Sequence, residues 1–192
     1  ISRQLARYVH KNVKKYMPEM NPMMIYRLDR FGRGGHHRPF NDLGFAGIRI
    51  MEAHENYVMQ HQDIRLENGI AYGDVIEGVD FNFAKKLTSV NAINLASLAW
   101  APPSVKKLSI GGIIEASVKF KWEKVKDPNV IGYKIYWRDT TSPVWQNERY
   151  VGDVNKYTLK GIVIDNFYFG IATVGKNGYE SPVVFPNGIF KN

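Results

Sequence analysis

The side chains best suited to chemistry are concentrated in one stretch of the chain, residues 29–63. Four of the five histidines lie there, at positions 36, 37, 54 and 61, interspersed with Asp, Glu and Arg. Neutral imidazole is the commonest side-chain ligand for metal ions, and imidazole and carboxylate groups move protons in hydrolysis. The stretch therefore favours a metal or hydrolytic site. Any one of these histidines taken alone is more often a satisfied loop or helix-end residue.

The absence of cysteine narrows this chemistry. It excludes disulfides, cysteine-ligated zinc, iron-sulfur centres and thiol nucleophiles. A site in this chain must use His, Asp, Glu and hydroxyl groups.

Three helical segments should position these side chains. Residues 2–16 carry apolar side chains three and four positions apart, and Pro18 prevents continuation. Residues 39–44 fit a short helix with Pro at its start and Gly at its end. Residues 80–100 fit a longer helix that Asp80 can cap.

Two apolar runs between these helices, residues 23–28 and 46–51, have the length of strands. Helices that alternate with strands are typical of a layered α/β fold, so we predict a partial α/β sheet domain. Two strands and three helices leave sheet edges and apolar helix faces uncovered. The chain also starts at Ile1 without an initiator Met or a signal region. We therefore expect a fragment that binds the missing N-terminal half of the same domain or a second copy.

The periodicity changes after the proline pair at residues 102–103, which places a domain boundary there. Residues 1–101 form the α/β part and residues 102–192 a second domain. Six strand candidates follow the boundary, at residues 105–110, 116–123, 132–138, 149–151, 157–159 and 167–174. Their length and spacing predict an all-β, immunoglobulin-like antiparallel sandwich.

Alternation along residues 132–138 predicts which side chains of this strand are buried. Tyr133, Ile135 and Trp137 should face the core, and Lys134, Tyr136 and Arg138 should face the other side. Trp122, the strand 132–138 and the segments 157–161 and 178–182 together resemble a fibronectin type III domain over residues 103–192. Such a module serves mostly as a spacer or docking surface, so it specifies no chemistry.

Several short elements of the first part, in this order, resemble the C-terminal part of a co-catalytic zinc aminopeptidase of metallopeptidase family 28, over residues 2–100. They are the Gly32-Arg33-Gly34-Gly35 turn, the His37-Arg38-Pro39-Phe40 element, the strand 47–50, the acidic segment 52–57, and His61 before Asp63.

The resemblance implies two zinc ions bridged by a carboxylate and a hydroxide and bound by His, Asp, Glu, Asp and a final His. His61 matches the final ligand, and Asp63 is a candidate to orient it, since a metal-bound imidazole usually donates its other N–H to a carboxylate or carbonyl. The other four ligands and the Glu that acts as general base would precede Ile1. We therefore expect no catalytic residue in this segment.

Five residues are candidates for substrate binding under this resemblance: Arg33, His36, His37, Phe40 and Tyr57. Two departures from the family pattern bear on specificity. His36 stands where the family usually has Asp, and Gln60 stands where many relatives have Tyr before the final His. Tyr57 is a possible substitute for that Tyr.

Charge and hydropathy limit the partners. The net charge of +8 is spread along the chain without a nucleic-acid-binding motif, so we expect no nucleic-acid partner. No apolar run approaches the roughly 20 residues that cross a bilayer. The resemblance to exported bacterial enzymes with appended β-sandwich modules suggests an extracytoplasmic location, periplasmic or secreted.

The function predicted from these features is hydrolysis of N-terminal peptide bonds by a zinc exopeptidase in the full-length protein, with peptide as substrate. This segment alone should be inactive. Two alternatives stay open: a non-catalytic binding or scaffold protein that uses the sandwich for docking, and a relative of the glutaminyl cyclases, which the replacement of Asp by His36 permits.

Overall fold

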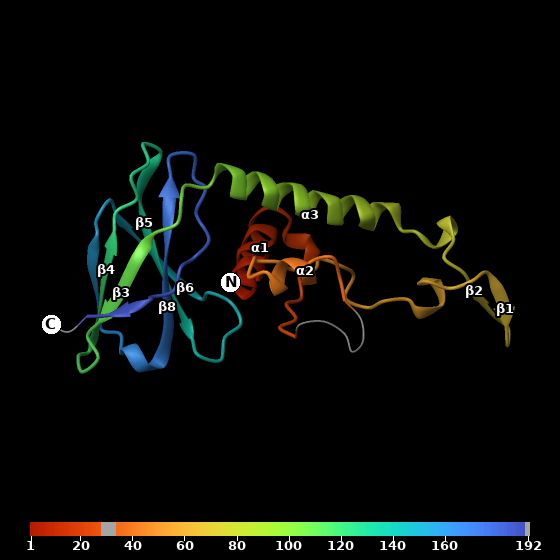
Figure 1. Cartoon of the computed structure of the whole chain (residues 1–192), viewed down its shortest axis with the longest axis horizontal. Coiled ribbons are helices and arrows are strands. Elements are labelled where there is room, and N and C mark those ends of the chain that lie inside the picture. The colour runs from red at the N-terminus through yellow and green to blue at the C-terminus, as the bar shows by residue number, and fades with distance from the viewer. Residues whose placement is uncertain (28–33, 191–192) are drawn as a thin grey trace.

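The computed structural model of the chain describes residues 1–27 and 34–190. The molecule is elongated, with the strands of a β-sandwich at one end and a small β-hairpin at the other, as Figure 1 shows. Helix α3 (Phe81–Trp100) runs between the two ends, and helices α1 (Ser2–Tyr16) and α2 (Arg38–Asp42) lie beneath it. No helix in the described ranges is long and apolar enough to cross a membrane.

The three predicted helices are confirmed. The Asp80 side chain accepts a hydrogen bond from the Phe83 N–H at 2.9 Å, which caps α3. After α2, Gly44 adopts a φ of 84°, a left-handed conformation that glycine takes without strain. Helices α1 and α3 pack together, and the buried Asn12 amide donates to the Asn94 side-chain oxygen at 3.0 Å.

The two strands predicted in the first part are not formed. Residues 23–27 and 46–51 have no strand assignment, and residue 28 lies outside the described ranges. A strand needs a neighbour for its backbone hydrogen bonds, and no described segment of this chain pairs with either run. The α/β sheet domain therefore remains a prediction. The only sheet described before residue 101 is a hairpin of β1 (Arg65–Glu67) and β2 (Ile70–Tyr72).

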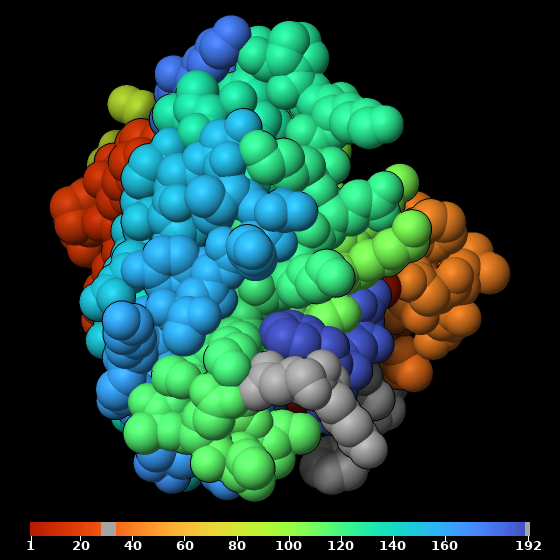
Figure 2. Space-filling view, turned by 90° about the vertical axis from the view of Figure 1, so that its left-hand side faces the viewer, coloured from red at the N-terminus to blue at the C-terminus, as the bar shows by residue number. Residues whose placement is uncertain are grey.

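The six strands predicted for the second part are confirmed, together with a short seventh. They are β3 (Lys106–Gly111), β4 (Ser117–Glu123), β5 (Val130–Asp139), β6 (Asn147–Gly152), β7 (Lys156–Lys160), β8 (Phe167–Gly175) and β9 (Gly188–Ile189). One sheet has the order β7-β4-β3-β9 and the other the order β6-β5-β8. Figure 2 looks onto this end of the molecule, where the sandwich (green to blue) makes most of the visible face and α1 (red) lies at one edge.

The sandwich core is rich in aromatic side chains. Phe120 of β4 and Phe169 of β8 meet edge to face with ring centroids 5.6 Å apart, and Trp122 and Tyr133 meet similarly at 5.3 Å. Such pairs stabilise a core beyond the area that they bury. Tyr133 and Ile135 are fully buried, as the alternation of β5 predicts.

The opposite face of β5 differs from the prediction. Tyr136 and Arg138 are 1% and 7% exposed, because α1 packs over this side of the sandwich. The Tyr8 hydroxyl donates to the Glu180 carbonyl at 3.2 Å and Gln4 donates to the Val183 carbonyl at 3.1 Å. Alternation within one strand identifies its two faces, but it does not reveal a helix that covers the second face.

The end of α3 and the residues that link it to the sandwich pack against the segment that follows β8. The Trp100 ring lies 5.3 Å from that of Tyr179, and the Asn177 side chain donates to the Trp100 carbonyl at 3.2 Å. Pro102, which follows, is buried. A boundary between residues 101 and 102 stays a prediction, and these contacts favour two domains that are held against each other.

Candidate functional site

His37 occupies the start of α2, in a space left by two glycines. A Cβ atom on Gly35 would lie 2.8 Å from the His37 Nδ1 atom, and one on Gly47 would lie 3.1 Å from the His37 carbonyl oxygen. Both distances are too short for ordinary contact, so these glycines permit the close approach. The same hypothetical Cβ on Gly35 would lie 3.4 Å from the Arg49 Cδ atom, which places His37 beside Arg49.

An ion pair between Arg49 and Glu55 and the hydrogen bonds of Asn41 complete the group of polar side chains around His37. Arg49 Nη2 lies 3.6 Å from Glu55 Oε1, and the two side chains are 30% and 18% exposed. The Asn41 amide of α2 donates to the Ser2 hydroxyl at 3.2 Å and to the Gly47 carbonyl at 3.3 Å. The fold thus gathers three of the elements that carried the peptidase resemblance: the His-Arg-Pro-Phe element, the 47–50 segment and the acidic segment.

The cluster opens into a groove between α1, α3 and the segments 20–27 and 46–53. Apolar side chains make much of the lining, and several nearby apolar side chains are strongly exposed, including Met23 (63%), Ile25 (57%) and Phe45 (63%). Apolar surface of this extent typically marks an interaction surface. The two runs that were predicted as strands border this groove.

The remaining predicted site residues are dispersed. His36 is exposed just before α2 and Phe40 is exposed within it. Tyr57, His61 and Asp63 are exposed on the segment that leads to the hairpin. Arg33 lies outside the described residues. Among the described residues, no hydrogen bond or ion pair joins the His61 and Asp63 side chains, so the orienting role of Asp63 stays a prediction.

His61 has an unusual backbone. Its φ is 54°, a left-handed conformation that few non-glycine residues adopt and that recurs at functional sites. It follows the single helical turn Tyr57–Met59, which the Asn56 side chain caps by accepting from the Val58 N–H at 3.2 Å. The sequence motif identified His61, but no sequence signal predicted this conformation.

The described residues do not by themselves form a zinc site. Within residues 1–27 and 34–190, no group of three or more His, Asp and Glu side chains is close enough to hold a metal ion. A catalytic zinc ion usually has three protein ligands and one open position. His61 has the right donor atom for one ligand, and the others would have to come from elsewhere.

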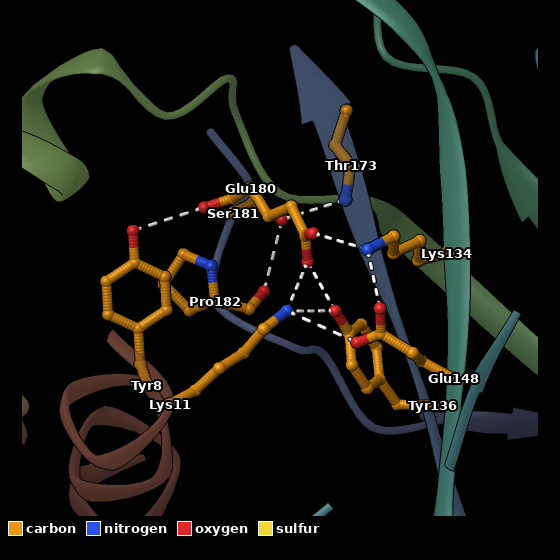
Figure 3. A network of polar contacts seen from close by, with 9 residues as sticks. All are labelled: Tyr8, Lys11, Lys134, Tyr136, Glu148, Thr173, Glu180, Ser181 and Pro182. Carbon is orange, nitrogen blue, oxygen red and sulfur yellow. Dashed lines mark hydrogen bonds and ion pairs between the residues drawn. The ribbon is translucent and has the colours of Figure 1, made fainter. Parts of the chain in front are cut away.

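A second polar cluster, which sequence analysis missed, joins α1 to the sandwich (Figure 3). Glu180 is at its centre: Lys11 donates to its Oε2 at 2.8 Å, Lys134 lies 2.9 Å from its Oε1, and the Tyr136 hydroxyl also donates to it. Lys134 also donates to Glu148 at 2.7 Å. The cluster holds one helix and two strands of the sandwich against the segment that follows β8.

The charges of this cluster shift its pKa values. Burial opposes ionisation of Glu180, but Lys11, Tyr136 and Lys134 outweigh it and hold the pKa of this carboxyl below its usual value. Burial, followed by the negative charge of Glu180, raises the pKa of the Tyr136 hydroxyl far above its usual value. The groups are therefore locked in single protonation states at neutral pH, which suits a structural contact and not proton transfer.

Replacing Glu180 by Gln should reduce the free energy of unfolding by about 2 kcal/mol at pH 7, because charge-assisted hydrogen bonds to Lys11 and Lys134 are lost. A carboxyl with a lowered folded-state pKa stabilises the protein above its unfolded-state pKa, and this contribution is lost as pH falls through the folded-state value. The difference between wild type and variant, measured by urea unfolding, should therefore shrink below about pH 4.5.

Glu123→Gln is the matched control, because Glu123 pairs with Lys107 where both side chains are exposed. Exposed ion pairs contribute little, so this variant should change stability by less than about 0.5 kcal/mol. Equal effects of the two substitutions at pH 7 would contradict a stabilising role for the Glu180 cluster.

Sequence comparison relates the whole chain to proteins named as zinc metalloproteases. A "Probable zinc metalloprotease" of Phaeosphaeria nodorum is 40% identical over 196 residues, which cover 100% of this chain and 40% of that protein. A protein of the same name from Pyrenophora tritici-repentis is 42% identical over 96% of this chain and 38% of its own length. One from Pyricularia oryzae is 35% identical over 96% of this chain and 38% of its own length.

The chain thus spans about 40% of the length of the curated relatives it matches. No family model matches it. Among solved structures, the fn3 domain of the human collagen alpha-1(XX) chain aligns with 48% of this chain and 91% of its own chain, at 12% identity and a TM-score of 0.36. A Fn3-like protein from Clostridium thermocellum aligns with 48% of this chain and 97% of its own, at 17% identity and a TM-score of 0.34.

Proposed function

We propose that this chain is the C-terminal segment of a zinc-dependent exopeptidase that hydrolyses N-terminal peptide bonds, and that the segment alone is inactive. The observation that carries the proposal is the similarity, along the whole chain, to proteins named probable zinc metalloproteases that are more than twice as long. In this proposal, the other zinc ligands and the general base belong to the additional sequence that the longer relatives contain. The proposal gives the complete enzyme two zinc ions.

His61 supplies one ligand in this proposal. Two features support it: an imidazole is a standard zinc ligand, and a left-handed backbone at an exposed, non-glycine residue is a conformation that a protein retains where geometry matters. Asp63 is its proposed orienting partner. The peptide substrate would contact Arg33, His36, His37, Phe40 and Tyr57.

The apolar groove is where the remainder of the catalytic domain would pack in this proposal. Its strands would pair with the segments 23–27 and 46–51, which border the groove and have no strand partner among the described residues. Burial of the exposed Met23, Ile25 and Phe45 side chains would drive the association. A second copy of the chain is the alternative occupant. An extracytoplasmic location belongs to the same proposal.

The test uses a protein that spans the full length of the curated relatives and contains this chain. We expect two zinc ions per molecule by elemental analysis and hydrolysis of aminoacyl amides that chelators abolish. Cleavage of internal peptide bonds with no release of N-terminal residues would overturn the exopeptidase assignment. Absence of zinc from the purified protein would overturn the metal assignment.

A further inference from the structure

Two arginines are almost completely buried where α1 meets the sandwich. Arg7 is 8% exposed and Arg138 is 7% exposed. A guanidinium group stays charged at every accessible pH, so it cannot avoid the cost of burial by losing its proton. A buried charge is stable only where other groups compensate it.

Both guanidinium groups are attached to one turn. Arg7 Nε donates to the Pro143 carbonyl at 2.7 Å, and Arg138 Nη1 donates to the preceding carbonyl, that of Ser142, at 2.5 Å. Because the two acceptors belong to consecutive residues, two like charges are held close together. The positive charge of Arg7 adds to burial in lowering the pKa of Arg138, which reflects this proximity.

Aromatic rings and carbonyl groups compensate these charges only in part. The Arg138 guanidinium lies 4.5 Å from the centre of the Tyr168 ring, and that of Arg7 lies 5.4 Å from the centre of the Tyr26 ring. None of the ion pairs between described residues includes Arg7 or Arg138. The Arg138 Nε–H group is buried and has no acceptor among the described residues. An unmade hydrogen bond of a buried charged donor is costly.

The two arginines border the groove described above, together with Arg3, Arg27, Tyr26 and Tyr168. Among the described residues that line the groove, the carboxylates are Glu52 and Glu55, and Glu55 pairs with Arg49 in the segment beside α2. The part of the groove next to the sandwich is thus strongly positive. An anion could reach the guanidinium pair from the groove.

We propose that Arg7 and Arg138, held by the Ser142–Pro143 turn, form a binding site for one oxyanion, a carboxylate or phosphate group. The guanidinium fork matches the paired oxygens of such a group. Arg7 Nε and Nη1 and Arg138 Nη1 already donate within the described chain, so the donors would be Arg7 Nη2, Arg138 Nη2 and Arg138 Nε. The oxyanion comes either from solution or from a carboxylate on polypeptide outside these 192 residues. Neither source depends on the peptidase assignment.

The test is an NMR titration of the ¹⁵N-labelled 192-residue chain with inorganic phosphate at constant ionic strength. Saturable shifts of the Nε–H signals of Arg7 and Arg138 are expected, with half-saturation on the order of 1 mM. Arg65, which donates to Glu67 at 2.9 Å on the exposed hairpin, is the internal control and should not shift. Equal, unsaturated shifts of all arginine signals, or no shift at all, would overturn the site.

Arginine-to-lysine substitutions test the site without relying on the NMR signal of a single Nε–H group. Arg138→Lys keeps the positive charge but removes the planar guanidinium fork, so phosphate affinity should fall about tenfold. If this variant does not fold, Arg7→Lys tests the same point. Arg65→Lys is the matched control and should bind as the wild type does. Unchanged affinity in a folded Arg138→Lys or Arg7→Lys variant would overturn the proposal.

The same titration in a protein that spans the length of the relatives distinguishes the two sources. Phosphate-dependent shifts in both proteins identify an anion from solution. Shifts in the 192-residue chain alone identify a carboxylate of the longer polypeptide, which already fills the site. Both results support the oxyanion site, whereas absence of binding by the 192-residue chain contradicts it.

Discussion

Replacing His61 by Asn in a protein that spans the length of the relatives should lower peptidase turnover by more than the roughly 10- to 100-fold typical of residues that merely orient a ligand. In the proposed site, the substitution would remove one coordinate bond from a zinc ion. Asn tolerates the left-handed backbone that His61 adopts, with its φ of 54°, so the loop should keep its conformation. Zinc stoichiometry and turnover are the measurements.

His54→Asn is the matched control, because His54 is an exposed histidine in the same stretch that matches no ligand position. His10 is less suitable, since it is partly buried and lines the groove. The control should retain zinc and turnover. A His61→Asn protein that still holds two zinc ions and turns over normally would exclude His61 from the metal site.

Replacing Phe120 by Ala should reduce the free energy of unfolding by about 3 to 5 kcal/mol, which corresponds to roughly 10 °C in melting temperature for a chain of this size. Phe120 is 1% exposed and packs against Phe169, so its removal leaves a cavity between the two sheets. Calorimetry of the 192-residue chain measures the effect. Lys121→Ala, at the exposed neighbouring position of β4, should change stability by less than about 0.5 kcal/mol.

A loss below about 1 kcal/mol in Phe120→Ala would mean that the sheets do not pack through this side chain. Such a result would contradict the sandwich core.

Local sequence signals predicted the helices and the sandwich strands well. The helix from Ser2 to Tyr16 and the helix capped by Asp80 were found because capping, proline stops and helical spacing act within a few residues. The strands of the sandwich were found because alternation and turns are also local. Each of these elements carries most of its determinants in its own sequence.

Features that depend on distant partners were not predicted. The runs 23–28 and 46–51 have the composition of strands, but pairing requires a neighbour that the described chain does not offer. The burial of Tyr136 and Arg138 depends on α1, more than 100 residues away in sequence. The Glu180 cluster combines side chains from four separate regions, namely α1, β5, β6 and the segment after β8, so no spacing rule could have revealed it.

The central claim is that this chain supplies part, and not all, of a zinc peptidase. The most direct measurement compares zinc-dependent hydrolysis of an aminoacyl amide by the purified 192-residue chain with hydrolysis by a protein that spans the length of the relatives. We expect turnover by the longer protein and none by the shorter chain. Robust, zinc-dependent turnover by the 192-residue chain alone would contradict it.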